Sequence, residues 1–197
     1  MIARTSVVVL MLGLVAAQKP LNVTLTYVPT DNGSTLTSPL PPSVLDRPAE
    51  IRIEDARVDL EPTVIGEGND GGKLYRIQAL GDPVKYLRET LLRIAGSQGL
   101  KTASPGGRQF RVRVVRFWIN HSDKAIGAMY NAEVSLAYSL TEKAGSVLAE
   151  GAQGATATRY GKGHSPDNCN ETLSDALKEA FLKVLDDQKL RDAWKIS

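Results

Sequence analysis

The sequence is short of the residues that build covalent or metal-held structure. It has one cysteine, Cys169, and two histidines, His121 and His164, among 197 residues. A single cysteine excludes an internal disulfide, and no two of these residues have the close paired spacing of structural zinc ligands. We expect Cys169 to be buried as a small apolar side chain and both histidines to lie in exposed turns. The sequence therefore predicts no metal and no cofactor.

The net charge is small, and long apolar runs are rare as well. The formal net charge is +2, from 24 basic and 22 acidic residues that are spread evenly along the chain. A nucleic-acid-binding protein normally carries a concentrated basic surface, so we exclude that class. The apolar run at residues 6–15 is about half as long as the roughly 20 residues that a membrane-spanning helix needs. We therefore expect no transmembrane span in the mature chain.

Residues 1–17 have the composition of a secretory signal peptide. Arg4 supplies a positive charge, the apolar run follows, and small residues end it at Ala16 and Ala17. We expect cleavage after Ala17 and an exported, periplasmic protein that begins at Gln18. The alternatives are a buried N-terminal strand or an uncleaved anchor. Ala17 also occupies the position where a bacterial lipoprotein has its lipidated cysteine, so we expect no lipid anchor.

The rest of the chain divides into two parts by composition. Residues 18–49 hold a short alternating strand near residues 21–27 and then a stretch rich in proline, serine and threonine, which predicts an extended tether without a helix. Residues 50–197 have the patterns of one domain. The clearest is the strict alternation of residues 130–140, which with residues 146–160 predicts a long antiparallel hairpin.

Other segments complete the predicted domain. Apolar alternation predicts strands at residues 51–60, 74–80 and 110–119, with a glycine-rich loop at 61–73 and a bulge at Val114-Val115. Asp82-Pro83 is a strong helix start, and an apolar stripe continues to Gly99. A second helix begins near Asn168 or Asn170 and continues to about residue 185. We expect a two-layer α+β domain, with an antiparallel sheet of about five strands and two helices on one face.

The glycine-rich loop and the histidines give weak signals for chemistry. Residues 66–71 match the dinucleotide-binding glycine pattern by letter, but they precede a strand and not a helix. A weak calcium site at Glu67, Asn69 and Asp70 stays open, although its spacing differs from that of a calcium loop. His121 lies beside Ser122-Asp123 without the elbow or oxyanion hole of a hydrolase. We expect a protein that is not an enzyme.

A local excess of basic residues gives the candidate interaction surface, near which Lys101 and Arg108 also occur. Arg111 and Arg113 alternate on one side of the predicted strand at 110–119, opposite the helices. Trp118 lies on the same side, so an anionic lipid head group or an acidic partner could bind there. The alternative is an ordinary solvated sheet face. The candidate residues are Arg111, Arg113, Arg116 and Trp118.

Four asparagines head Asn-x-Ser/Thr sequences. These residues would be glycosylation acceptors in a eukaryotic secretory pathway and would have no such role in a bacterial periplasm. They are Asn22, Asn32, Asn120 and Asn170.

Several of these segments together resemble the YajG-like lipoproteins of bacterial envelopes. The resemblance covers about residues 51–194 and rests on the helix at 84–100, the strand at 110–119, the alternation at 130–140 and the helix at 173–185. It implies a non-enzymatic periplasmic protein that acts near the outer membrane by binding. The family is similar in architecture to the auxiliary lipoproteins of envelope lipid transporters and to the lipopolysaccharide-assembly lipoprotein. We keep an auxiliary subunit of such a complex, and an unrecognised hydrolase, as alternatives.

Overall fold

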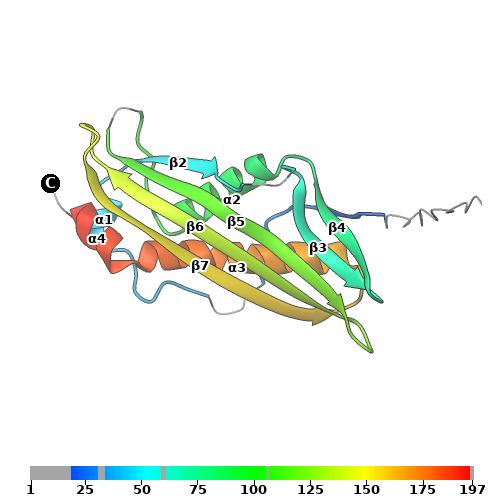
Figure 1. Cartoon of the computed structure of the whole chain (residues 1–197). Coiled ribbons are helices and arrows are strands. Elements are labelled where there is room, and N and C mark those ends of the chain that lie inside the picture. Colours follow the sequence, from blue (N-terminus) through cyan, green and yellow to red (C-terminus); the bar gives the residue numbers. More distant parts are fainter. Residues whose placement is uncertain (1–18, 31–33, 59–60, 106, 196–197) are drawn as a thin grey trace, which may run out of the picture.

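A computed structural model describes residues 19–30, 34–58, 61–105 and 107–195 of the chain (Figure 1). The predicted signal peptide at residues 1–17 lies outside the described residues. Among the helices that are described, none is long and apolar enough to cross a membrane.

A seven-stranded sheet forms one layer, with the strand order β1-β4-β3-β5-β6-β7 and with β2 paired to β5 as well. The strands are β1 (Leu21–Thr24), β2 (Glu50–Asp55), β3 (Val64–Asp70), β4 (Lys73–Leu80), β5 (Gln109–Asp123), β6 (Ala128–Thr141) and β7 (Val147–Gly161). The helices are α1 (Pro42–Leu45), α2 (Pro83–Ser97), α3 (Pro166–Asp186) and α4 (Gln188–Lys195). Figure 1 shows α2 and α3 behind the sheet.

The α+β class is confirmed, but the prediction of an antiparallel sheet of about five strands is wrong. The sheet has seven strands and is mixed, because β1 runs parallel to β4 and both β2 and β3 run parallel to β5. β2 and β3 pair with successive parts of the same edge of β5, at residues 109–114 and 119–122. β3 and β4 form a tight hairpin, so they must run antiparallel to each other. Because β3 runs parallel to β5, β4 runs antiparallel to β5.

Strand β3 was not predicted from the sequence, because its glycines indicate a loop. A Cβ atom on Gly66 would lie 2.1 Å from the carbonyl oxygen of Ile119, and one on Gly68 would lie 2.1 Å from the ring of Tyr75. These glycines therefore allow close packing within the sheet. The turn to β4 uses Gly71 and Gly72, whose φ angles of +56° and +86° fit a two-residue hairpin.

The core lies between the helices and one face of the sheet, which we call the inner face; the opposite side is the outer face. Residues on alternate positions of β6, from Ala128 to Leu140, are buried on the inner face. The predicted bulge is confirmed, since the β5–β6 register shifts between Val114 and Arg116 and so returns Phe117 to the core. Each fully buried large apolar side chain stabilises the fold by roughly 1.5–3 kcal/mol.

Both predicted helices exist with defined caps. The side chain of Asp82 accepts hydrogen bonds from the backbone amides of Val84 and Lys85 at the start of α2. Helix α3 begins at Pro166, slightly before the predicted start, because Ser165 accepts a hydrogen bond from the amide of Asn168. The C-terminal residues form α4, whose Trp194 packs edge-on against Phe110 at 5.1 Å between ring centroids.

The N-terminal segment lies on α3, which it covers on the side away from the sheet. Strand β1 joins β4, and the backbone amides of Thr26, Val28 and Thr30 then donate to polar side chains of α3. Those side chains belong to Asn170, Ser174 and Asp175, all of which are buried. The expectation of a tether without a helix is wrong, since Pro42–Leu45 forms the single turn α1. Proline is accommodated there at the first helical position.

Replacing Asp175 tests how much the docked N-terminal segment stabilises the protein. Its carboxylate accepts from the amide of Thr30 at 2.7 Å and from the hydroxyl at 2.6 Å, and it pairs with Arg159 at 3.2 Å. We expect Asp175→Ala to lower the free energy of unfolding by about 2–3 kcal/mol in urea denaturation, because buried donors lose their acceptor. Asp167→Ala, at an exposed position of α3, should lower it far less; equal losses would contradict the assignment.

Candidate functional site

The four residues of the predicted interaction surface all project from the outer face. Across the sheet, Arg111, Arg113, Arg116 and Trp118 of β5 pair with Ser139, Ala137, Ser135 and Glu133 of β6. Because the bulge at Val115 adds one residue, Arg116 and Trp118 stay on the same face as Arg111 and Arg113. We call these four residues the arginine surface.

Carboxylates balance much of the charge of the arginine surface. Arg111 lies 3.3 Å from Glu54, and Arg116 lies 2.5 Å from Glu133. The Arg116 guanidinium also lies 5.7 Å from the centre of the Trp118 ring. Arg113 is exposed and has no carboxylate partner among the described residues. The unbalanced positive charge of this surface therefore belongs mainly to Arg113.

The other two basic residues named from the sequence lie outside the arginine surface. Lys101 is 3.7 Å from Asp46, and Arg108 donates to the carbonyl oxygen of Trp194 at 2.8 Å. Both therefore contact the segment around α1 and α4.

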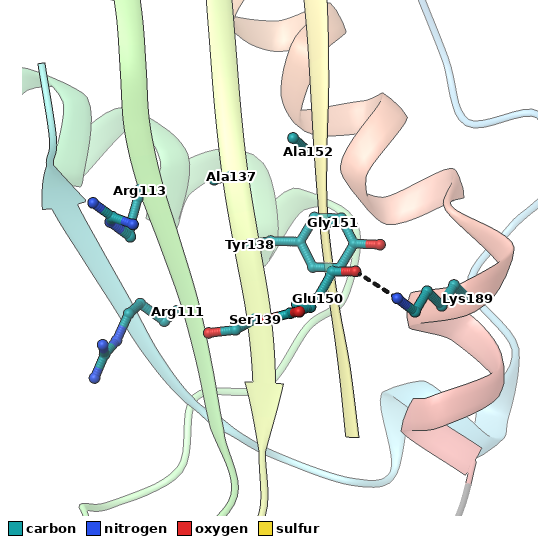
Figure 2. A pocket seen from close by; sticks show the side chains of 9 residues that line it. All are labelled: Arg111, Arg113, Ala137, Tyr138, Ser139, Glu150, Gly151, Ala152 and Lys189. Carbon is teal, nitrogen blue, oxygen red and sulfur yellow. Dashed lines mark hydrogen bonds between the residues drawn. The ribbon is translucent and has the colours of Figure 1, made fainter. Parts of the chain in front are cut away.

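Two adjoining grooves lie next to the arginine surface. The first, of about 550 Å³, is lined by Arg111, Arg113, Ala137, Tyr138, Ser139, Glu150, Gly151, Ala152 and Lys189 (Figure 2). A second, of about 510 Å³, shares Arg111, Ser139 and Glu150 with it. Small side chains on β6 and β7 leave a depression in this part of the outer face. Lys189 lies at its edge and donates a hydrogen bond to the carbonyl oxygen of Glu150 at 3.0 Å.

The structure brings the two histidines together, which no pattern in the sequence predicts. His121 lies within β5 and is 2 % exposed, so the prediction that it sits in an exposed turn is wrong. The even spacing of β5 directs this polar residue to the inner face, where it follows Phe117 and Ile119. His164 does lie in an exposed turn, between β7 and α3. Its ring centroid is 5.3 Å from that of His121.

A polar cluster surrounds the two histidines. The hydroxyl of Tyr75 hydrogen-bonds to Nδ1 of His121, whose Nε2 lies 3.4 Å from Asp123. His164 stacks on Tyr75 at 4.9 Å between centroids, and its Nε2 lies 3.6 Å from Asp70. These residues come from β3, β4, β5 and the β7–α3 loop, and we call the group the loop cluster. Its contacts join segments that are far apart in sequence.

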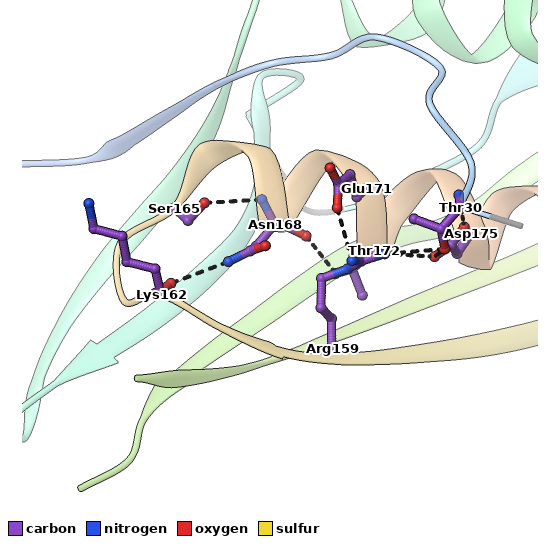
Figure 3. Close-up of polar contacts among 8 residues, drawn as sticks. All are labelled: Thr30, Arg159, Lys162, Ser165, Asn168, Glu171, Thr172 and Asp175. Carbon is purple, nitrogen blue, oxygen red and sulfur yellow. Dashed lines mark hydrogen bonds and ion pairs between the residues drawn. The ribbon is translucent and has the colours of Figure 1, made fainter. Parts of the chain in front are cut away.

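The β7–α3 loop is held in place by its own hydrogen bonds as well. The hydroxyl of Tyr130 donates to the carbonyl of Lys162 at 2.5 Å and accepts from the amide of Ser165 at 2.9 Å. Figure 3 shows Ser165 capping α3 and the Lys162 side chain extending away from the helix. His164 adopts a φ of +51°, which is uncommon for a residue with a side chain.

Burial and neighbouring charges set the protonation of the cluster. Burial lowers the pKa of His121, and the nearby Asp123 carboxylate offsets part of that effect. A hydrogen bond with Asp70 raises the pKa of Asp123, because this bond favours the protonated form of the Asp123 carboxyl. Burial raises the pKa of Tyr75 and also raises the pKa of Cys169 to about 12. Neither residue is therefore an activated nucleophile.

The cluster does not form a metal centre. Within the described part of the chain, no three His, Cys, Asp or Glu side chains are grouped so that they could hold an ion. At the calcium candidate, the side chain of Asn69 instead accepts a hydrogen bond from the amide of Gly72 at 2.9 Å. Cys169 is buried, as predicted.

The structure also places three of the four candidate glycosylation residues. Asn22 and Asn120 are exposed, on β1 and β5. Asn170 is buried and accepts from the amide of Thr26 at 2.9 Å, so it is not accessible in the folded chain. Asn32 lies outside the described residues.

Comparison with known proteins finds similarity in structure and none in sequence. No family model matches the chain. No curated protein matches it either. A crystal structure of a Xanthomonas campestris protein of the DUF330 family matches with a TM-score of 0.52 and 14 % identity, over 87 % of this chain and 93 % of that one. This likeness shows a shared fold.

Two further solved structures are lipoproteins by description. A putative lipoprotein from Caulobacter crescentus matches with a TM-score of 0.39 and 17 % identity, over 59 % of this chain and 83 % of that one. A minor lipoprotein from Acinetobacter baumannii has a TM-score of 0.34 and 10 % identity, over 52 % of this chain and 80 % of that one.

The buried state of His121 predicts a pH dependence of stability. The fold keeps His121 neutral, whereas an unfolded histidine takes up a proton below a pKa of about 6.5. The stability that neutral His121 contributes is complete above about pH 6.5 and is lost as pH falls toward the lower pKa of the folded state. Between pH 7.5 and 5.5, urea denaturation should show a larger loss for the wild type than for His121→Gln.

The comparison isolates His121, because Asp70, Asp123 and His164 are present in both proteins. A wild type and a His121→Gln variant with parallel pH profiles would show that the burial of His121 has no such effect.

Proposed function

We propose that this chain is an exported protein of a bacterial envelope that acts by binding and not by catalysis. The arginine surface is the part through which it binds. The envelope role rests on the resemblance found in the sequence, and the DUF330 protein shows that this fold occurs in another bacterial protein. Burial raises the pKa of Tyr75 and of Cys169, so we do not propose either of these two side chains as a nucleophile.

The single observation that carries this proposal is the open outer face of β5, β6 and β7. It presents an exposed, unmatched Arg113, which lines a groove of about 550 Å³, and an aromatic residue, Trp118, farther along the same face. Arginine and tryptophan are enriched where proteins bind partners. The two grooves give this sheet face a shape that a partner can complement.

The finer proposal is a YajG-like protein of the periplasm, processed after Ala17 and not lipid-anchored. An auxiliary subunit of an envelope lipid-transport or lipopolysaccharide-assembly complex is the second candidate. It is favoured by the same surface, because Arg113 could pair with an acidic residue of a transporter subunit or with a lipid phosphate. An unrecognised hydrolase is the remaining alternative.

In-cell photo-crosslinking tests the binding proposal in the bacterium that produces the protein. A photoreactive residue at Ser135, between Arg113 and Trp118 on the outer face, should capture an envelope protein or lipid. The same residue at Arg88, an exposed position of α2, should not. Adding Arg113→Glu should lower the yield at Ser135 roughly tenfold, because an introduced like charge opposes an anionic partner.

Mass spectrometry of the captured product identifies the partner and the N-terminus of the protein in one measurement. A transporter subunit would favour the second candidate, and an N-terminus at Gln18 would support export. Equal yields at Ser135 and Arg88, or an intact leader on a cytosolic product, would contradict the proposal.

A further inference from the structure

Strand β7 has a free edge, because it is the last strand of the sheet and pairs only with β6 (Figure 1). It is 15 residues long, whereas strands of about 5–6 residues are the most common. Among the described residues, no backbone group from another element bonds to this edge. At the other margin of the sheet, β1 has only four residues. Of the two margins, β7 therefore presents the longer row of unpaired backbone groups.

Two lysines show which backbone groups of β7 point to the free edge. The ammonium of Lys189 donates to the carbonyl oxygen of Glu150 at 3.0 Å, and that of Lys183 donates to the carbonyl oxygen of Gly154 at 3.4 Å. Because these lysines belong to α4 and α3, both carbonyls point away from β6. The direction alternates along a strand, so the other even-numbered residues of 150–160 also direct their amides and carbonyls outward.

The two lysines are the groups that cover carbonyl oxygens of this edge. A long free edge is a template for pairing with another chain, and natural proteins oppose this with proline, bulges or charged side chains. β7 contains no proline, and its pairing with β6 is regular from residue 149 to 161. Arg159 pairs with Glu171 and Asp175 of α3, so its side chain leaves the backbone of the edge free.

We infer that the free edge of β7 is a pairing site for a second copy of this chain, and that Lys183 and Lys189 keep this site closed. An incoming strand must bring its amide groups to the carbonyl oxygens of Glu150 and Gly154. The two ammonium groups already occupy these positions. Pairing would displace both of them and leave charged groups beside newly buried backbone, which is unfavourable.

The lysines oppose a second copy more strongly than a strand of an unrelated protein. Two copies that pair β7 with β7 are related by a two-fold axis, so each contributes the same edge and the same two lysines. Both pairs of ammonium groups must then be displaced together. Glu179 lies 2.8 Å from Lys183, so the effect depends on where the ammonium groups lie and not on net charge.

This inference goes beyond the proposed function and does not rest on it. The free edge is at the margin of the sheet, whereas Arg113 and Trp118 lie on the outer face of β5, two strands away. Lys189 also lines the groove beside Arg113, so a second copy on β7 would lie next to that groove. A closed edge leaves the groove open to a partner from that side.

Sedimentation velocity on the chain from Gln18 onward, which contains every described strand and helix, tests the inference. The double variant Lys183→Met, Lys189→Met keeps the apolar stems and removes both ammonium groups. Its apparent mass should be about twice that of the wild type, because two copies pair. The control Lys85→Met, Lys124→Met removes the same charge at exposed positions of α2 and the β5–β6 turn, and should keep the wild-type mass.

Hydrogen exchange and a proline substitution locate the contact. The outward amides of Thr156 and Thr158 should exchange rapidly in the wild type and about tenfold or more slowly in the Lys183→Met, Lys189→Met variant. Adding Thr156→Pro to this variant should restore the wild-type mass. Proline has no amide hydrogen, and the amide of Thr156 makes no bond to β6 that could be lost.

The inference is overturned if the Lys183→Met, Lys189→Met variant keeps the wild-type mass, or if both double variants associate equally. Amides of Thr156 and Thr158 that are already protected in the wild type would also overturn it. Association without a change in their exchange would assign the contact to another surface. Urea denaturation checks that each variant is folded, and the exchange of these two amides decides the result if Thr156→Pro unfolds the chain.

Discussion

The structure depends on covering one apolar face of the long β5–β6–β7 ribbon. Every second residue of β6 from Ala128 to Leu140 points to the inner face, and a ribbon of this length cannot leave such a surface in water. Helix α3 covers it. The helix is itself buried on nearly all sides, because the N-terminal segment lies across its other face and hydrogen-bonds to Asn170, Ser174 and Asp175. The chain is thus three layers thick at α3.

Covering one face leaves the other for interactions. The outer face carries Arg111, Arg113, Arg116 and Trp118, which are exposed or half-buried, and small residues on β6 and β7 help to form the grooves beside Arg111 and Arg113. At the end of the ribbon, the loop cluster joins three connections through buried His121 and its partners. The grooves on the outer face and the loop cluster at the end of the ribbon therefore lie on separate parts of one sheet.

The sequence indicated the parts of these sites that follow a simple period. The alternation of apolar and polar residues predicted that Arg111 and Arg113 lie on one face of the strand. The adjacent Val114 and Val115 indicated the bulge that keeps Trp118 on the same face. It could not indicate the loop cluster, because His121 and His164 are separated by a whole hairpin and meet only when β6 and β7 return the chain. Nor could it indicate Lys189, which reaches the groove from α4.

The sequence by itself determined the α+β class, the β6–β7 hairpin, the Asp82 and Pro83 helix start and the burial of Cys169. These features depend on neighbours along the chain or on the apolar period of one element. Only the tertiary structure decided the direction and number of strands. Gly66 and Gly68 indicate a loop until β5 and Tyr75 are packed against them, and β2 becomes parallel only beside β5. Contacts between distant residues set those choices, and no local pattern encodes them.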